Sequence, residues 1–255
     1  MKRMKKLVVG NWKMNPTSIE EARKIAGDVK RAMRGVTKTQ VVLCPPFVYL
    51  SLLSGVPKGS LFLGAQNANH ETLGPFTGEV SYSELYQFGV RYVILGHSER
   101  RKMGENDELI NKKVKSVVGS GMTAIVCIGE STRDGNGDYF NFIKQQIISD
   151  LKDVSKKSLD RVVIAYEPIW AVGAKEAMSP ADLLETSIYI KKVLKDTFGI
   201  MSDGMRILYG GAVDRANCDR LVHDGNVSGL LIGRQSQIPK DFIEIIKLID
   251  AIQND

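Results

Sequence analysis

Cysteine is scarce in this 255-residue chain. Its three cysteines, Cys44, Cys127 and Cys218, are odd in number and far apart, with no CxxC spacing and no histidine close by. This pattern argues against a disulfide framework and against a zinc site. We therefore expect three buried thiols.

Long apolar runs are also missing. No stretch approaches the roughly 18 apolar residues that a membrane-spanning helix needs. The basic start MKRMKK leads only into LVVG before Asn11 and Trp12, which is too short for the apolar core of a signal peptide. We expect a soluble, cytoplasmic protein without a membrane partner.

The charge balance is only mildly basic. Lysine and arginine number 35 against 29 aspartates and glutamates, which gives a formal net charge of +6. The basic residues are interleaved with acids and form no stripe flanked by aromatic side chains, so we expect no nucleic-acid partner. The excess charge would help to attract a small anion.

Short apolar or β-branched runs recur along the chain, each followed by a segment with helical periodicity. The predicted strands are Lys6–Gly10, Gln40–Cys44, Ser60–Gly64, Arg91–Leu95, Met122–Ile128, Arg161–Tyr166, Met205–Tyr209 and Ser228–Gly233. Apolar strands that alternate with amphipathic helices require a covered parallel sheet. Eight such units in about 250 residues predict an α/β fold, a closed (β/α)8 barrel, rather than an open sheet.

Two helix starts support this reading. Ser18-Ile-Glu-Glu21 resembles a capping box, and Ser179-Pro180 places a cap before a helix that we expect over 180–198. No low-complexity linker interrupts the chain, and DGNGD at 134–138 reads as a loop. We expect one domain over residues 1–255.

Polar residues collect where the predicted strands end. They are Asn11 and Lys13 after the first strand, Gln66 and Asn67 after the third, His97, Ser98 and Glu99 after the fourth, and Glu167 after the sixth. In a closed barrel these ends converge on one rim, where such barrels carry out chemistry. A carboxylate at the end of a buried strand is costly to desolvate, which marks Glu167 as a candidate functional residue.

These segments resemble the triosephosphate isomerase family over essentially the whole chain. The matching segments are GNWKMN at 10–15, GAQN at 64–67, FTGEVS at 76–81, ILGHSERR at 94–101, CIGE at 127–130, AYEPIWAVG at 165–173 and YGG at 209–211. GHSERR with a downstream YEPxWA is the most specific part. The resemblance implies interconversion of dihydroxyacetone phosphate and glyceraldehyde 3-phosphate in glycolysis and gluconeogenesis, with no metal or other cofactor.

The resemblance also implies roles for three catalytic residues. Glu167 would move a proton between adjacent carbons through an enediolate, and a dry setting strengthens a carboxylate as a base. His97 opens the turn SERR, where helix N–H groups favour an uncharged imidazole that donates a hydrogen bond to the oxyanion. Lys13 would stabilise the enediolate and help to bind the phosphate.

Supporting roles follow from the same pattern. Asn11 would be a second hydrogen-bond donor to the substrate, and Glu99 would fix the position of Lys13. Val172 and Leu231 match an apolar clamp over the carboxylate of Glu167. Ser98 belongs to the histidine motif itself.

The phosphate would be held mainly by backbone N–H groups with helix-dipole support. The expected donors are Gly173, Ala212, Gly233 and Arg234. The chain departs here from the family pattern: YGGS is YGGA at Ala212, the second glycine of strand eight is Arg234, and the lid GTGKTA is Gly173-Ala174-Lys175-Glu176-Ala177-Met178. Backbone donors survive these changes, whereas hydroxyls and glycine flexibility do not.

Two of the departures bear on lid closure. In the family the YGGS serine latches the closed lid through the N–H at the position of Lys175, and the YGG tyrosine forms a second latch. This chain keeps only Tyr209, whose hydroxyl we expect near the backbone of Met178, so closure should be weakened but not abolished. Arg234 either points into solvent, which we favour, or contacts the phosphate and offsets the weaker lid.

The PFTGEVS loop, with Phe76, Thr77 and Gly78, resembles a loop that the family buries in the neighbouring subunit beside Lys13 and Asn11. A homodimer is therefore implied, and a mere surface loop is the alternative. Two other functions remain open: a different sugar-phosphate isomerase, and a non-catalytic binding or moonlighting paralogue, which the altered lid would suit.

Overall fold

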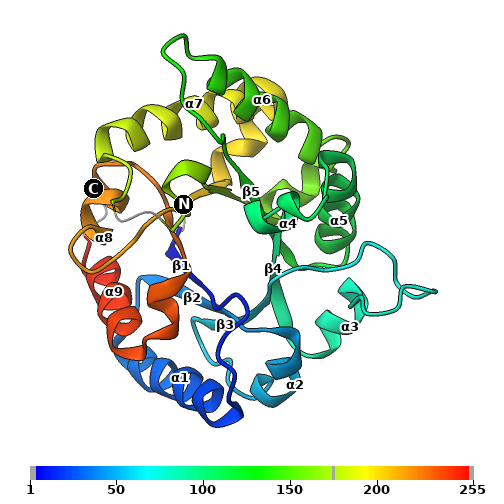
Figure 1. Cartoon of the computed structure of the whole chain (residues 1–255), viewed down its shortest axis with the longest axis vertical. Coiled ribbons are helices and arrows are strands. Elements are labelled where there is room, and N and C mark those ends of the chain that lie inside the picture. Colours follow the sequence, from blue (N-terminus) through cyan, green and yellow to red (C-terminus); the bar gives the residue numbers. More distant parts are fainter. Residues whose placement is uncertain (1–3, 174–175, 253–255) are drawn as a thin grey trace.

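The strands close into a barrel in which every neighbouring pair is parallel. The structure is a computed structural model that describes residues 4–173 and 176–252, apart from the side chains of 200, 201 and 203. The strands follow one another around the barrel in chain order until the last pairs with the first (Figure 1). They are β1 (Lys6–Asn11), β2 (Thr39–Cys44), β3 (Leu61–Ala65), β4 (Val90–Leu95), β5 (Thr123–Ile128), β6 (Val162–Tyr166), β7 (Arg206–Tyr209) and β8 (Gly229–Ile232).

Helices surround the barrel and cover the outer face of its sheet (Figure 1). They are α1 (Ile19–Ala32), α2 (Leu50–Leu53), α3 (Tyr82–Gln87), α4 (Ser98–Lys102), α5 (Asp107–Gly119), α6 (Asp138–Asp150), α7 (Pro180–Phe198), α8 (Cys218–His223) and α9 (Pro239–Ala251). Short 3-10 turns lie between these elements, including η1 (Met33–Gly35) and η6 (Arg234–Gln237). The (β/α)8 barrel that the sequence predicts is confirmed, and each predicted strand end lies within one residue of the observed one.

The expected helix starts are largely confirmed. Ser179 accepts a hydrogen bond from the N–H of Asp182 and begins α7, and Pro180 is its first residue. Ser18 likewise accepts from the N–H of Glu21 at 3.2 Å, but its hydroxyl donates to the Glu20 carboxylate, so only half of the predicted capping box forms. A complete capping box occurs instead at Ser81, before α3.

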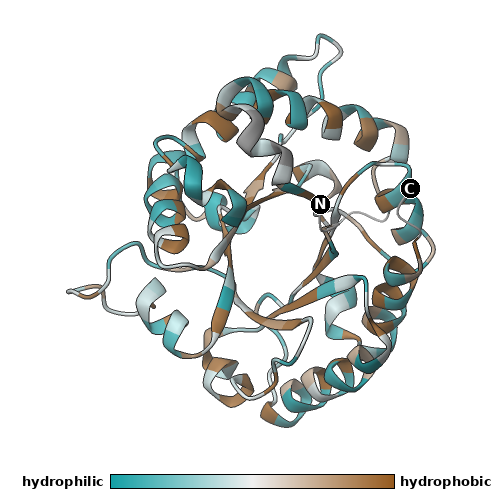
Figure 2. Ribbon diagram, turned by 180° about the vertical axis from the view of Figure 1, so that it is seen from behind, coloured by the Kyte–Doolittle hydropathy of each residue, from teal (hydrophilic) through white to brown (hydrophobic). Residues whose placement is uncertain are grey.

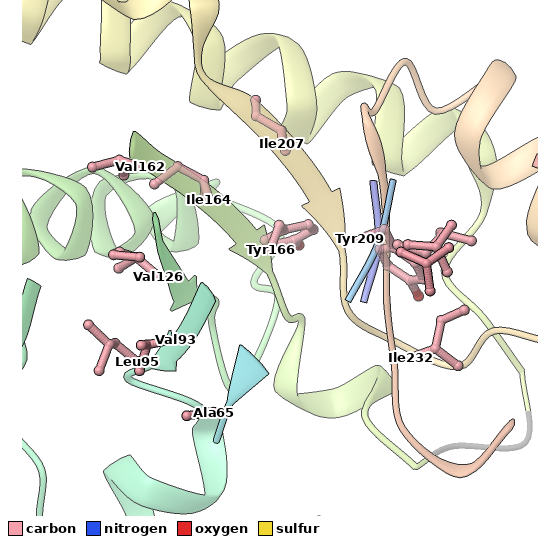
Figure 3. Close-up of a cluster of buried hydrophobic side chains, with 14 of the residues drawn as sticks. Ala65, Val93, Leu95, Val126, Val162, Ile164, Tyr166, Ile207, Tyr209 and Ile232 are labelled. Atoms are coloured by element: carbon pink, nitrogen blue, oxygen red, sulfur yellow. The ribbon is translucent and has the colours of Figure 1, made fainter. Parts of the chain in front are cut away.

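The core has two layers, because successive side chains of a strand point to opposite faces of the sheet. The larger layer lies between strands and helices, and Figure 3 shows part of it, with Leu95, Val126, Tyr166 and Ile207. The inner layer fills the barrel with side chains such as Val9. Figure 2 shows hydrophobic residues along the strands, while the helices carry both hydrophilic and hydrophobic positions.

The cysteines lie inside these layers as free, buried thiols, as predicted. Burial raises the pKa of all three thiols, that of Cys218 to about 11. Across the described ranges, no helix is both long enough and apolar enough to cross a membrane.

Candidate active site

A cavity of about 360 Å³ opens at the carboxyl ends of the strands. It brings together ten of the residues that the sequence singled out, from five different strand ends and the loops that follow them. They are Asn11, Lys13, His97, Glu167, Val172, Gly173, Ala212, Leu231, Gly233 and Arg234. Ser98 and Glu99 are not part of this lining but hydrogen-bond to two of its residues, Glu167 and Lys13. Tyr209 does not line the cavity either, and its hydroxyl accepts from the N–H of Met178.

Glu167 follows β6 and is only 3% exposed. Its N–H donates to the carbonyl of Ile128 at 2.7 Å, and its carboxylate accepts a 3.3 Å hydrogen bond from the N–H of Ser98. Two glycines make this placement possible: a Cβ on Gly129 would lie 2.0 Å from the Glu167 carbonyl oxygen, and one on Gly210 would lie 2.7 Å from its Cγ. The carboxylate is therefore dry and held in a tight backbone setting.

His97 is the N-cap of α4, and its ring is oriented by that helix. Nδ1 accepts a 3.1 Å hydrogen bond from the N–H of Glu99. Because Nδ1 uses its lone pair in this bond, the proton of the neutral ring lies on Nε2. Nε2 lies 3.3 Å from Oε1 of Glu167, so a hydrogen-bond donor and a buried carboxylate face each other in the cavity lining.

Arg101 anchors the turn that carries His97. Its guanidinium donates to the carbonyls of Gly96 at 2.8 Å and Cys127 at 3.0 Å, which joins the end of β4 to β5. Asp107 and Asp150 hold the same guanidinium at 2.5 and 2.6 Å. The sequence reading missed this role; the only signal was that Arg101 belongs to the GHSERR motif.

Lys13 is held in a strained backbone conformation, with a φ of 54°. Such a left-handed conformation costs a non-glycine residue on the order of 1–3 kcal/mol and persists only when its surroundings enforce it. Here the Lys13 N–H donates to Oδ1 of Asn11 at 3.0 Å, and its carbonyl accepts from Gln66 at 2.7 Å. The ammonium contacts Oε1 of Glu99 at 2.5 Å, so Glu99 is the expected partner.

The charge of Glu99 is maintained by this contact. Burial alone would raise the pKa of Glu99, but the hydrogen bond and charge of Lys13 contribute to a net shift below its usual value of 4.5. The pair stays accessible, with side chains 30% and 51% exposed. The ammonium is therefore fixed in direction yet open to a ligand.

The loop that the family resemblance predicts to act as a lid begins directly after Glu167, and hydrogen bonds hold both of its ends. At its start, the Trp170 indole donates to Glu130 at 2.9 Å, and the Tyr166 hydroxyl donates to the same oxygen. At its end, the Met178 N–H donates to the Tyr209 hydroxyl at 3.1 Å, which confirms that expected contact. Ala174 and Lys175, which belong to the predicted lid, lie outside the described residues, so the predicted loss of the latch at Lys175 stays a prediction. Glu176 is exposed and Ala177 half-buried.

The expected phosphate donors Gly173, Ala212, Gly233 and Arg234 all line the cavity. A Cβ on Gly233 would lie 3.4 Å from Cε of Lys13, so this part of the lining adjoins the ammonium. Arg234 is exposed and also lines the cavity. Within residues 4–173 and 176–252, no group of three or more His, Cys, Asp or Glu side chains is arranged to hold a metal ion.

A closed parallel barrel with a carboxylate, an imidazole and an ammonium at the carboxyl ends of its strands defines a (β/α)8-barrel enzyme. The family model for triosephosphate isomerase matches residues 6–249. The chain belongs to the triosephosphate isomerase family and is an isomerase.

Curated relatives match along nearly the full length. A triosephosphate isomerase of Alkaliphilus oremlandii is 39% identical over 95% of this chain and 98% of its own. One of Syntrophotalea carbinolica is 36% identical over 94% of this chain and 96% of its own. One of Clostridium botulinum (strain Okra / Type B1) is 39% identical over 94% and 98%.

Proposed function

We propose that the protein interconverts dihydroxyacetone phosphate and D-glyceraldehyde 3-phosphate, with Glu167, His97 and Lys13 as catalytic residues. The observation that carries this proposal is the meeting of a buried carboxylate with an Nε2–H donor at 3.3 Å in the cavity that Lys13 also lines. The names of the matched relatives agree with it.

The proposed reaction is a proton transfer between adjacent carbons. Glu167 removes a proton from the carbon beside the carbonyl, and the electrons of the broken C–H bond form the enediolate. The Nε2–H of His97 and the ammonium of Lys13 stabilise the oxyanion as its charge develops. The hydroxyl proton of the enediolate moves to the other oxygen, and protonated Glu167 returns its proton to the neighbouring carbon as the first oxygen becomes the new carbonyl.

A coupled assay with each triose phosphate tests the activity directly. We expect turnover in both directions with the wild type and a severe loss with Glu167→Gln. Turnover of other sugar phosphates but of neither triose phosphate would support a different isomerase. Phosphate binding without any turnover would support a non-catalytic paralogue.

The lid offers a second test. Ala212→Ser restores a hydroxyl near the lid, and one neutral hydrogen bond contributes roughly 0.5–1.5 kcal/mol, so the closed state should gain several-fold in population. Tyr209→Phe removes the observed bond to Met178 and should act in the opposite direction. Turnover and hydrogen exchange of the lid amides measure both, since lid motion often limits such enzymes. Unchanged kinetics in Ala212→Ser would mean that the lost latch is unimportant.

We also propose that two copies form a homodimer through the loop that carries Phe76, Thr77 and Gly78. This loop extends away from the barrel beside α3 (Figure 1). A second hollow of about 320 Å³, lined by Lys13 and Gly78, adjoins the active site. Large apolar side chains around this region are strongly exposed, which is typical of an interaction surface: Met14 (89%), Leu73 (83%), Val48 (79%) and Met103 (76%).

Light scattering in solution measures the assembly. We expect a mass twice that of the 28.2 kDa chain. Thr77→Arg should shift the protein toward the monomer and lower turnover, because it adds a charge to the exposed loop of the proposed interface. Asn136→Arg, on the other projecting loop, adds the same charge as a control. A monomeric wild type would make the first loop an ordinary surface loop. The cytoplasmic location stays a prediction.

A further inference from the structure

The side chain of Arg234 lies at the cavity and carries a positive charge. It has no partner in the described part of the chain. Arg234 follows Gly233 at the start of η6, directly after β8, and lines the same cavity as Lys13 and Glu167. No hydrogen bond or ion pair joins its guanidinium to residues 4–173 or 176–252. Arg101, which follows β4, is by contrast held by the carboxylates of Asp107 and Asp150.

We propose that the Arg234 guanidinium binds the phosphate end of the substrate, in addition to the backbone N–H groups there. This inference rests on the proposed function, and it goes beyond the backbone grip that the family resemblance implies. On sequence alone we favoured a side chain that points into solvent. The structure adds that this exposed side chain also lines the cavity.

The neighbourhood leaves the guanidinium free for an anion. The acids in the cavity lining are Asp214 and Glu167, and Oδ1 of Asp214 already accepts from the N–H groups of Ala216 and Asn217. The carboxylate of Glu167 accepts from the N–H of Ser98 and lies beside Nε2 of His97. A planar guanidinium can meet two oxygens of a phosphate monoester at once, which an amide N–H cannot do.

The position also matters for the order of events. Arg234 belongs to the β8 turn and not to the lid, so its charge is in place whether or not the lid is closed. Ala212 provides no hydroxyl on the neighbouring turn. We therefore expect the side chain to raise affinity for phosphate dianions before closure, and to do little for the proton transfer itself.

Arg234→Gln tests this, because it keeps the backbone N–H and removes the charge. Its matched control is Arg34→Gln, which removes an exposed charge from η1 at the amino end of the barrel. We expect Arg234→Gln to raise the dissociation constant of inorganic phosphate and the KM of the triose phosphates by about tenfold, the size of one contact to a charged group. Arg34→Gln should change neither.

Three further measurements distinguish the loss of the guanidinium–phosphate contact from a general disturbance of the fold. The slow isomerisation of unphosphorylated glyceraldehyde should be equal in wild type and Arg234→Gln, because this substrate lacks the group that Arg234 binds. Arg234→Lys should bind phosphate more tightly than Arg234→Gln but less tightly than the wild type, because lysine keeps the charge and lacks the two parallel N–H donors of a guanidinium. The tenfold effect should shrink as salt screens the contact.

The outcomes distinguish this inference from the proposed function. Equal phosphate binding by wild type and Arg234→Gln in calorimetry would overturn the inference and leave the side chain in solvent, even if the enzyme turns over triose phosphates. Weakened phosphate binding in an enzyme that isomerises neither triose phosphate would support the inference and overturn the proposed function.

Discussion

Glu167→Gln is expected to lower kcat for both triose phosphates by at least about 10²–10⁴-fold, the usual contribution of a positioned general base. Glutamine has nearly the same shape, so it can fill the dry site and still accept from the N–H of Ser98. It cannot accept a proton from carbon. KM should change little, because the lost interaction acts in the transition state and not in substrate binding.

A surface substitution controls for the loss of one negative charge. Glu185→Gln removes an exposed carboxylate from α7 and should leave kcat unchanged. Thermal unfolding of Glu167→Gln should show that the variant is folded. A folded Glu167→Gln variant with wild-type kcat would contradict the assignment of the base.

The barrel could be predicted from the sequence because its signal is local. Each strand is a short apolar run such as VVIAY at 162–166, and each strand end is marked by a change to polar residues. Parallel closure then brings Asn11, His97 and Glu167 to one rim whatever the loops do. The same local change marks the candidate site residues, whereas their proposed roles come from the family resemblance.

Other features depend on contacts between distant segments, which one sequence does not display. The Nε2–H tautomer of His97 follows from a bond that Nδ1 accepts, and the setting of Glu167 depends on Gly129, 38 positions earlier. Arg101 anchors the turn of His97 through bonds to the carbonyls of Gly96 and Cys127, which lie at the ends of two different strands. The strained backbone of Lys13 is also invisible in sequence, because a lysine gives no reason to expect a positive φ.

Glu105→Leu is expected to cost about 3–5 kcal/mol of unfolding free energy, because it leaves a buried charge without its partner. Glu105 is 6% exposed, and its Oε1 accepts from Lys113 at 2.6 Å and from Arg100 at 2.8 Å. Lys113 is 3% exposed, so in the variant its ammonium would keep only the 3.0 Å bond to Asn67. In thermal unfolding we expect a midpoint lower by about 10 °C for a chain of this length.

The pH dependence of this effect has a definite sign. Burial alone would raise the pKa of Glu105, but Lys113 and Arg100 outweigh it and hold the pKa below the usual 4.5. A carboxyl whose pKa is lower in the folded state than in the unfolded state stabilises the fold at pH values above its unfolded pKa. This stabilisation is lost as the pH falls through the folded pKa. The stability difference between wild type and Glu105→Leu should therefore be full at neutral pH and shrink in acid.

A double variant separates the broken pair from lost packing. Glu105→Leu with Lys113→Met replaces both charges by apolar groups, and such replacements are often neutral or stabilising, so much of the lost stability should return. Glu108→Gln breaks the exposed pair with Lys112 and should have only a small effect.

Asn67 accepts from Lys113 and donates to Glu105, and it follows Gln66, which donates to the Lys13 carbonyl. The Glu105→Leu variant should therefore also loosen the backbone beside the active site. Wild-type stability of Glu105→Leu at neutral pH, or a double variant no more stable than the single one, would show that the buried charges are not what holds this region together.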